Sequence, residues 1–221
     1  PWFKVSELTG AKVEFIPLDE EGRITPSNVK KVINNKVKVI SIAQVGNVLG
    51  YLVDVKAIAK IAHDYGAIIV VDGAQSVPHI KVDFKDLDID FLAFSAHKMC
   101  GPTGVGVLVG KFDLLQNMDP IRMGGGMNAK FFKDGVIQYL DAPVKFEAGT
   151  LNLAGLLGLE AAIKFIESIG LENIHKHEME LRDYALNELK DYEDIIIYNK
   201  NSDAGIITFN IKNVFAQDEA T

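Results

Sequence analysis

The sequence has one cysteine, no basic run and no long apolar run, and each scarcity excludes a class of protein. The single cysteine, Cys100, cannot form an internal disulfide framework and fits a reducing cytoplasm. The net charge of -7 and the lack of a segment rich in Lys and Arg argue against nucleic acid or an anionic membrane as a partner. No apolar run reaches the length that spans a bilayer, and the first residues do not resemble a signal peptide.

The rest of the composition is typical of a globular chain. Of the 221 residues, 48% are hydrophobic and 24% are charged, which suffices for one sizeable core and part of a second. Both ends indicate a fragment of a longer protein. The chain begins at Pro1 without a methionine and already within a helical pattern, and residues 218–221 resemble the first turn of a helix rather than its end.

Short apolar strands alternate with amphipathic helices in the first half of the chain. The predicted strands are 13–16, 37–43, 67–71, 91–94 and 104–109. One predicted helix begins at Thr25-Pro26, and another ends at Gly66. This alternation predicts an α/β fold with a mostly parallel sheet and helices on both faces. Strands that end at Asp72 and Ser95 would then finish at the same carboxyl edge, where such sheets bind ligands.

After residue 150 the pattern changes to two long helices followed by two strands. Asn152 is a candidate cap for the first helix, which is predicted to end before Gly170. The predicted strands are 195–198 and 206–211. These elements indicate the start of a smaller α+β domain, so we place a large domain at 1–165 and part of a small domain at 166–221.

Three segments contain polar groups suited to chemistry. Asp72 ends a buried strand at the expected ligand edge, although Asp72-Gly73 alone is also a common strand-end turn. Lys98 follows Ser95 and His97, which can donate to a phosphate, and precedes a glycine-rich stretch that lets backbone approach closely. A lysine after a strand is otherwise an ordinary surface residue. The third segment contains Thr150, which could instead belong to a helix cap.

Together these groups meet the needs of one cofactor, pyridoxal 5'-phosphate (PLP). PLP needs a lysine that bonds it covalently, a carboxylate that keeps its pyridine nitrogen protonated, and donors for its phosphate. An ion pair about 4 Å apart is worth about 4 kcal/mol at an effective dielectric constant near 20. A turn or cap role for Asp72 would be worth about 1 kcal/mol. The larger energy favours the cofactor role.

The motifs closely resemble those of the NifS/SUF-type cysteine desulfurases, which are class V aminotransferases of PLP fold type I. The matching motifs are Asp72-Gly73-Ala74-Gln75, Ser95-Ala96-His97-Lys98-Met99, Gly101-Pro102-Thr103-Gly104 and Phe146-Glu147-Ala148-Gly149-Thr150. Asn47-Val48-Leu49-Gly50 and Gly124-Gly125-Gly126-Met127 also fall in order. The resemblance therefore extends over nearly the whole chain, as a fragment that lacks both ends.

The resemblance implies a role for each motif residue. Lys98 would bond the cofactor and later move the substrate proton. Asp72 would pair with the pyridine nitrogen, and Gln75 would hydrogen-bond the phenolic oxygen. Asn47 would lie near the ring and the substrate carboxylate.

The remaining implied roles concern the phosphate and a second subunit. Ser95 and His97 would hold the phosphate of the cofactor. Thr150 would reach the phosphate in the partner subunit, which implies a homodimer with shared active sites.

Some positions depart from the family pattern. Gly46 stands where serine is frequent, Ala96 where glycine is frequent, and Cys100 where an aromatic residue is common. We expect Cys100 to be a buried packing residue rather than a catalytic one. The family's nucleophilic cysteine and its arginine for the substrate carboxylate would lie after Thr221.

The resemblance implies a PLP-dependent cysteine desulfurase. It would convert L-cysteine to L-alanine and an enzyme-bound persulfide, and pass the sulfur to an acceptor protein for iron-sulfur cluster assembly. A selenocysteine lyase, another class V lyase or transaminase, and a non-catalytic assembly subunit of this fold remain alternatives. We expect no metal, because His175 and His177 are two apart on a predicted helix and point to different sides.

Overall fold

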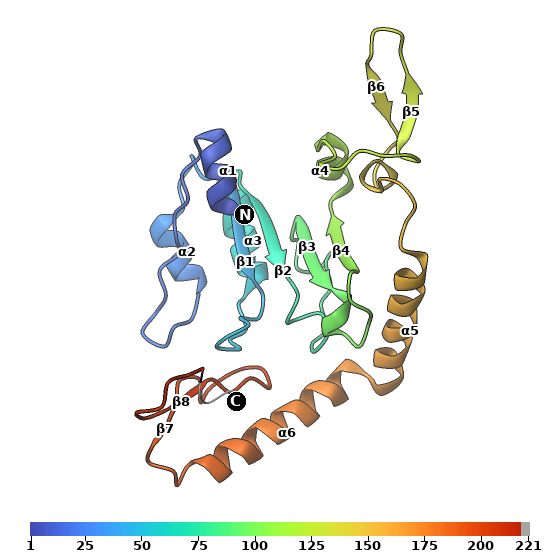
Figure 1. Cartoon of the computed structure of the whole chain (residues 1–221). Coiled ribbons are helices and arrows are strands. Elements are labelled where there is room, and N and C mark those ends of the chain that lie inside the picture. Colours follow the sequence, from blue (N-terminus) through green and yellow to red (C-terminus); the bar gives the residue numbers. More distant parts are fainter. Residues whose placement is uncertain (218–221) are drawn as a thin grey trace.

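A computed structural model describes residues 1–217 of the chain (Figure 1). Its central sheet has the order β1-β2-β3-β4. The strands are β1 (Val39–Ala43), β2 (Ile68–Asp72), β3 (Phe91–Ser95) and β4 (Gly106–Gly110). β1, β2 and β3 are parallel, and β4 pairs antiparallel with β3. The predicted α/β fold with a mostly parallel sheet is confirmed.

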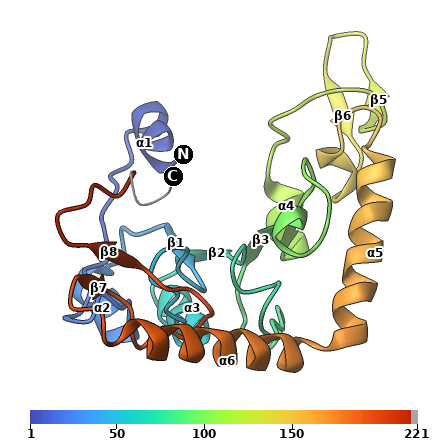
Figure 2. The same ribbon diagram turned by 60° about the horizontal axis from the view of Figure 1, so that its bottom comes forward.

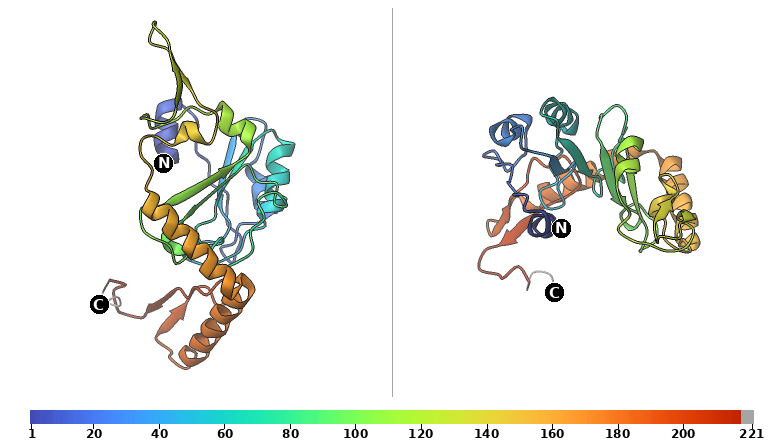
Figure 3. Two further views of the ribbon diagram at one scale, coloured as in Figure 1. Left: turned by 90° about the vertical axis from the view of Figure 1, so that its right-hand side faces the viewer. Right: turned by 90° about the horizontal axis from the view of Figure 1, so that it is seen from above.

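Two helices, α2 (Pro26–Val32) and α3 (Val55–Asp64), cover one face of the sheet. α3 has a wide apolar stripe, and it packs against alternate residues of the strands such as Ile69 and Val71, which are fully buried. Helix α1 (Trp2–Thr9) lies on the opposite side of the sheet (Figure 3) and has no buried residue. The main core therefore lies between the sheet and α3.

The predicted helix caps are confirmed. Thr25 Oγ1 accepts the N–H of Asn28 at 3.3 Å, and Asn28 Oδ1 accepts the N–H of Thr25 at 3.0 Å, so the two residues cap α2 reciprocally. Asn152 Oδ1 accepts the N–H of Gly155 at 3.0 Å and caps α5 (Leu153–Ile169), which ends at Gly170 as predicted.

The predicted strand at 13–16 is wrong. No strand of the described residues pairs with this segment, so its backbone forms no ladder. Its apolar side chains have another use: the ring of Phe15 lies 6.1 Å from that of Phe3 in α1. An alternating apolar pattern predicts a strand only where a neighbouring strand is available.

The second part of the chain adds long helices and two small sheets. After α4 (Phe112–Asn117), a hairpin of β5 (Asn128–Phe131) and β6 (Ile137–Tyr139) projects from the body of the molecule (Figures 1 and 3). The turn η2 (Val144–Phe146) precedes α5. Helix α6 (Leu171–Leu189) then leads to β7 (Ile195–Ile197) and β8 (Phe209–Ile211), which pair antiparallel and are shorter than predicted.

The carboxyl ends of β1, β2 and β3 face the last third of the described chain. Helix α6 runs along this end of the sheet, with β7 and β8 beside it (Figures 1 and 2). Leu159 and Ile166 of α5 form a second core with Ala96 and Met99, which follow β3. The division at residue 165/166 stays a prediction, and α5 runs through it as one continuous helix. The helix start expected at 218–221 lies outside the described residues.

Candidate active site

Parallel pairing brings the predicted site residues Asp72 and Ser95 to one edge of the sheet. Asp72 pairs with Ala93 of β3, two residues before Ser95. The Asp72 carbonyl accepts the N–H of Gln44 at 3.0 Å, and the N–H of Gly73 donates to Ala93 O at 2.8 Å. Backbone hydrogen bonds on both sides therefore fix the point at which Asp72 leaves the sheet.

The carboxylate of Asp72 is exposed, and one of its two oxygens is hydrogen-bonded. Its Oδ1 accepts the N–H of Ala74 at 2.9 Å, which is the strand-end turn that the Asp-Gly dipeptide suggested. Its Oδ2 has no hydrogen-bond partner among residues 1–217. The turn and a cofactor contact are therefore compatible, because each uses a different oxygen.

Lys98 lies on a short, closed turn directly after β3. This turn, η1 (Ala96–Lys98), is held by the carbonyl of Ala96, which accepts the N–H of Met99 and of Gly101, both at 2.9 Å. A Cβ at Gly101 would lie 2.8 Å from that carbonyl oxygen, so the close return of the chain requires glycine. The sequence therefore places the half-buried amine of Lys98 on rigid backbone beside the edge of the sheet.

Three predicted site residues from three segments meet at Asn47. Its Oδ1 accepts a hydrogen bond from Lys98 Nζ at 3.3 Å and another from Gln75 Nε2. Gln75 lies in the turn after β2, and Asn47 lies in the turn after β1. The carboxyl ends of three successive strands thus supply one polar cluster, as expected for a parallel sheet.

The three residues predicted to contact the phosphate, Ser95, His97 and Thr150, differ in exposure and in their distance along the chain from Lys98. Ser95 is half-buried and His97 is exposed, and neither side chain makes a hydrogen bond to another described residue. Both are within three residues of Lys98. Thr150 is exposed on the loop between η2 and α5, and no hydrogen bond among the described residues joins it to the Lys98 cluster. Within one chain, Thr150 therefore takes no part in the hydrogen bonds that join the side chains of Lys98, Asn47 and Gln75.

The expectation that Cys100 is buried is wrong. Its thiol is free and exposed, and its backbone has a left-handed φ of 60°. Met99 takes the buried position of this turn instead, with 6% of its surface exposed. Cys100 is thus exposed directly beside the buried Met99, and the sequence pattern does not reveal which of the two neighbours faces the core.

His79 has a polar partner that sequence reasoning missed. Its Nδ1 lies 2.6 Å from Oε1 of Glu178 in α6. These two residues and Gln75 line a cavity of about 410 Å³ between the turn after β2 and the α6 region. No local pattern joins residues 99 positions apart, so the sequence offered no sign of this pair.

The groups at this edge fit PLP. Lys98 supplies an amine, Asp72 supplies a carboxylate oxygen without a partner in the described chain, and Ser95 and His97 supply donors for a phosphate. Among residues 1–217, no group of three or more His, Cys, Asp or Glu side chains could hold a metal ion. Over the same residues, no helix has the length and apolar character needed to cross a bilayer.

Comparison with known proteins identifies the class. A family model described as Aminotransferase class-V matches residues 1–221, and the chain belongs to this family. A probable cysteine desulfurase of Halalkalibacterium halodurans is 48% identical over 221 residues, which are all of this chain and 54% of that protein. One of Staphylococcus epidermidis is 47% identical over 223 residues, with the same coverage. The chain thus spans about half the length of the curated relatives that it matches.

Solved structures agree with this placement. The chain resembles the cysteine desulfurase CsdA of Escherichia coli with a TM-score of 0.93 at 34% identity, covering 98% of this chain and 54% of that one. It also resembles the apo structure of a cysteine desulfurase from Thermococcus onnurineus NA1 with a TM-score of 0.87 at 37% identity, covering 99% and 55%. The described fold is therefore the fold of these enzymes over about half their length.

Proposed function

We propose that this chain is the cofactor-binding part of a PLP-dependent cysteine desulfurase that acts on L-cysteine. The observation that supports it best is the cluster of Lys98, Asn47 and Gln75 at the carboxyl edge of the sheet, beside Asp72. The names of the relatives at 47–48% identity favour this activity over that of other class V enzymes. The proposed products are L-alanine and a persulfide on the enzyme.

The chain's own residues divide the work. When bound, PLP supplies an electron sink for negative charge at the substrate Cα. Lys98 anchors the cofactor and moves the Cα proton, while Asp72 Oδ2 holds the proton of the pyridine nitrogen. Asn47 and Gln75 orient the ring and its phenolic oxygen. The closed turn fixes the backbone of Lys98, and the hydrogen bond to Asn47 Oδ1 holds its amine beside the sheet edge.

The phosphate contacts lead us to propose a homodimer. Ser95 and His97 would bind the phosphate from the same chain as Lys98. Thr150 is exposed and is not joined to that cluster, which suits a residue that completes the site of a partner subunit. The two domains of each chain would be residues 1–165 and the region from 166 onward.

The wider role that we propose is sulfur delivery in the cytoplasm. An enzyme-bound persulfide needs an acceptor protein, and iron-sulfur cluster assembly is the process that the family resemblance suggests. The single, exposed cysteine supports a reducing compartment. Nucleic acid and membranes are not proposed as partners, given the net charge of -7.

Borohydride reduction tests the central assignment. Reduction of the PLP-loaded, full-length protein, followed by peptide mapping, should place the pyridoxyl group on Lys98. The same protein should release alanine and sulfide from L-cysteine in the presence of a thiol. Lys98→Arg keeps the charge but should take no label. A label on another lysine, or turnover of selenocysteine without turnover of cysteine, would contradict the proposal.

A further inference from the structure

Asn47 lies on a turn in which several backbone carbonyl groups find no hydrogen-bond donor within the turn itself. Residues 46–52 form this turn between β1 and α3. The N–H of Gly46 donates to Tyr51 O at 3.2 Å, and the N–H of Gly50 donates to Gly46 O at 2.9 Å. The carbonyl groups at the tip of the turn receive no hydrogen bond from within it. Unpaired backbone groups cost free energy, so the turn depends on partners from elsewhere.

Those partners come from residues 199–208, which lie between β7 and β8. Four donors of this segment reach three successive carbonyl groups: Asn199 Nδ2 to Leu49 O at 3.0 Å, Asp203 N–H to Gly50 O at 3.1 Å, Ser202 Oγ to Gly50 O at 3.3 Å, and the Thr208 hydroxyl to Val48 O. A Cβ at Gly50, where φ is 67°, would collide with Ser202 Oγ. Glycine therefore permits the close approach of the two segments.

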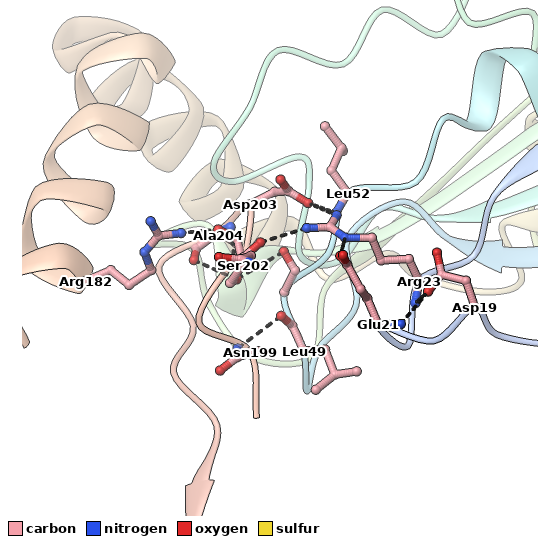
Figure 4. A network of polar contacts seen from close by, with 12 residues as sticks. Asp19, Glu21, Arg23, Leu49, Leu52, Arg182, Asn199, Ser202, Asp203 and Ala204 are labelled. Carbon is pink, nitrogen blue, oxygen red and sulfur yellow. Dashed lines mark hydrogen bonds and ion pairs between the residues drawn. The ribbon is translucent and has the colours of Figure 1, made fainter. Parts of the chain in front are cut away.

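Arg23 and Asp203 close this contact with an ion pair (Figure 4). Asp203 Oδ2 accepts from Arg23 Nη1 at 2.6 Å and from the N–H of Leu52 at 2.9 Å. The guanidinium also donates to Asn201 O at 2.7 Å and lies 4.0 Å from the centre of the Tyr51 ring. The side chains of Arg23 and Asp203 are 24% and 39% exposed, so solvent screens the pair only in part.

The chemistry of this contact favours a fixed geometry. The hydrogen bond to Asp203 raises the pKa of Arg23, so the guanidinium keeps its charge. The guanidinium also donates from Nε to Glu21 Oε2 at 3.3 Å. A planar guanidinium that donates to three groups and stacks on a ring has one preferred position, unlike a lysine in its place. The turn is thus held at Tyr51 and Leu52 on one side and at its carbonyl groups on the other.

We propose that Arg23 and Asp203 are positioning residues for the active site and act on Lys98 through Asn47. Neither residue makes a hydrogen bond or an ion pair with Lys98, Gln75 or Asp72. Each instead fixes the 46–52 turn, whose Asn47 Oδ1 accepts from both Lys98 Nζ and Gln75 Nε2. The inference rests on the proposed function for the meaning of Lys98. It adds that the segment between β7 and β8 sets the position of a contact on the catalytic lysine.

Hydrogen exchange in the full-length protein without cofactor tests the first step. Asp203→Asn keeps the shape of the side chain and weakens the pair, and Arg23→Met keeps the apolar stem without the charge. Each should speed exchange of the Leu52 amide by roughly tenfold. Asp86→Asn is the matched control, because it removes an exposed ion pair with Lys56 and should leave this amide unchanged.

The second step is tested on the PLP-loaded protein. Both variants should still take the pyridoxyl label on Lys98 but lose part of the visible circular dichroism of the bound cofactor, because Asn47 no longer holds one position. The Arg23→Met/Asp203→Asn double variant should match the single variants rather than add their effects. Arg23→Lys, which keeps the charge, should retain more of the signal than Arg23→Met.

The outcomes separate this inference from the proposed function. Folded variants with unchanged exchange at Leu52 would overturn the positioning role. So would an unchanged dichroism signal in the single variants, or a loss of signal that adds up in the double variant. A wild-type protein whose label falls on another lysine would contradict the proposed function, while the exchange experiment would still decide whether Arg23 and Asp203 hold the turn. Thermal unfolding identifies a variant that has simply lost its fold, and Arg23→Lys then supplies the comparison.

Discussion

The two ends of the strands in the central sheet, its amino and carboxyl edges, differ in how fully their charged groups are paired. At the amino edge, Asp90 is 6% exposed in its side chain and fully paired. Its Oδ1 lies 2.8 Å from Lys111 Nζ, and its Oδ2 lies 2.9 Å from His63 Nε2 and accepts the N–H of Ile69 at 2.8 Å. Asp88 adds a second contact to Lys111 at 2.8 Å. Every group in this network has a partner.

At the carboxyl edge the polar groups have few partners. Asp72 keeps one oxygen without a hydrogen bond among residues 1–217, and Ser95 and His97 make no side-chain bonds to other described residues. Within the described part of the chain, Lys98 makes one side-chain hydrogen bond, at 3.3 Å to Asn47. Satisfied charges stabilise a fold, whereas groups that keep donors and acceptors available can bind a ligand. We therefore expect the groups at the amino edge to stabilise the fold and the groups at the carboxyl edge to bind the cofactor.

Exchanging a lysine at each edge for alanine gives the largest expected contrast. Lys98→Ala should lower turnover by at least about a thousandfold, because it removes the covalent anchor and the proton-moving group, and should leave the melting temperature unchanged. Lys111→Ala should lower the unfolding free energy by about 1–2 kcal/mol and leave turnover of the folded protein within about twofold. Steady-state kinetics and thermal unfolding of both variants check this. Equal losses of turnover in the two variants would contradict the division into a stabilising amino edge and a cofactor-binding carboxyl edge.

Subunit mixing tests whether the chemical edge is completed by a partner. If Thr150 serves the other subunit, a heterodimer of Lys98→Ala and Thr150→Ala chains has one site with both lesions and one with neither. Equal mixing then restores about a quarter of the wild-type activity, since about half of the dimers are mixed and each has one intact site. Activity that stays at the level of the separate variants, with subunit exchange shown by native mass spectrometry, would contradict a shared site.

At the amino edge, Asp90→Asn should cost stability without affecting chemistry. The change removes the nearly buried charged partner of Lys111 and His63 and leaves them the exposed Asp88, which should lower the unfolding free energy by about 2 kcal/mol. Asp86→Asn, at an exposed pair, should cost less than about 0.5 kcal/mol. Urea unfolding at neutral pH measures both. Equal effects would show that the amino-edge network is no stronger than a surface pair.

The difference in unfolding free energy between wild type and Asp90→Asn should decrease as the pH falls. Burial alone would raise the pKa of Asp90, but hydrogen bonds from Lys111, the Ile69 N–H and His63 outweigh it and hold the pKa below its ordinary value of 3.8. A lowered carboxyl pKa means that the stabilisation is complete above the unfolded value and is lost as the pH falls through the folded one. The gap between wild type and Asp90→Asn should therefore shrink on acidification towards about pH 3 and stay constant near neutrality.

Sequence reasoning predicted the chemical edge better than the stabilising one. Asp72 and Ser95 each end a strand, and the rule that parallel strands share a carboxyl edge places them together from the sequence alone. The amino-edge network joins His63 in α3 to Asp90, directly before β3, and Asp90 to Lys111, directly after β4; no local pattern marks such a set. The caps at Thr25 and Asn152 were predictable because a cap is local chemistry.

The failures have the same physical origin. The segment 13–16 has a strand-like pattern, but Phe15 lies beside Phe3 of α1, Ile16 packs against the main core, and no strand of the described residues pairs with it. The pair of Arg23 and Asp203, which no sequence pattern indicated, spans 180 positions. Tertiary contacts of this length depend on how whole elements pack, so periodicity and propensity do not contain them.

Substitution of Cys100 should have the smallest effect on turnover among these variants. It tests whether the residues around Lys98 include the sulfur-accepting thiol. Cys100 lies two residues past Lys98, is exposed, and is the one cysteine in the chain. The turn that holds it is closed by the Ala96 carbonyl, which fixes the thiol by backbone geometry rather than by a mobile loop. A sulfur-accepting thiolate must reach the substrate sulfur and then present a persulfide to an acceptor, which calls for mobility. We therefore expect another cysteine of the full-length protein to do this.

Two variants without the thiol separate its chemistry from its backbone role. Cys100→Ala keeps the strained φ of 60°, and Cys100→Gly relieves it, which should stabilise the protein by about 1 kcal/mol. Both should keep the yield of alanine and sulfide within about twofold of wild type, because a surface substitution away from reacting atoms changes little. A loss of turnover in both, with cofactor spectrum and fold intact, would make Cys100 the persulfide carrier. A loss in Cys100→Gly alone would instead assign the effect to the position of the Lys98 turn.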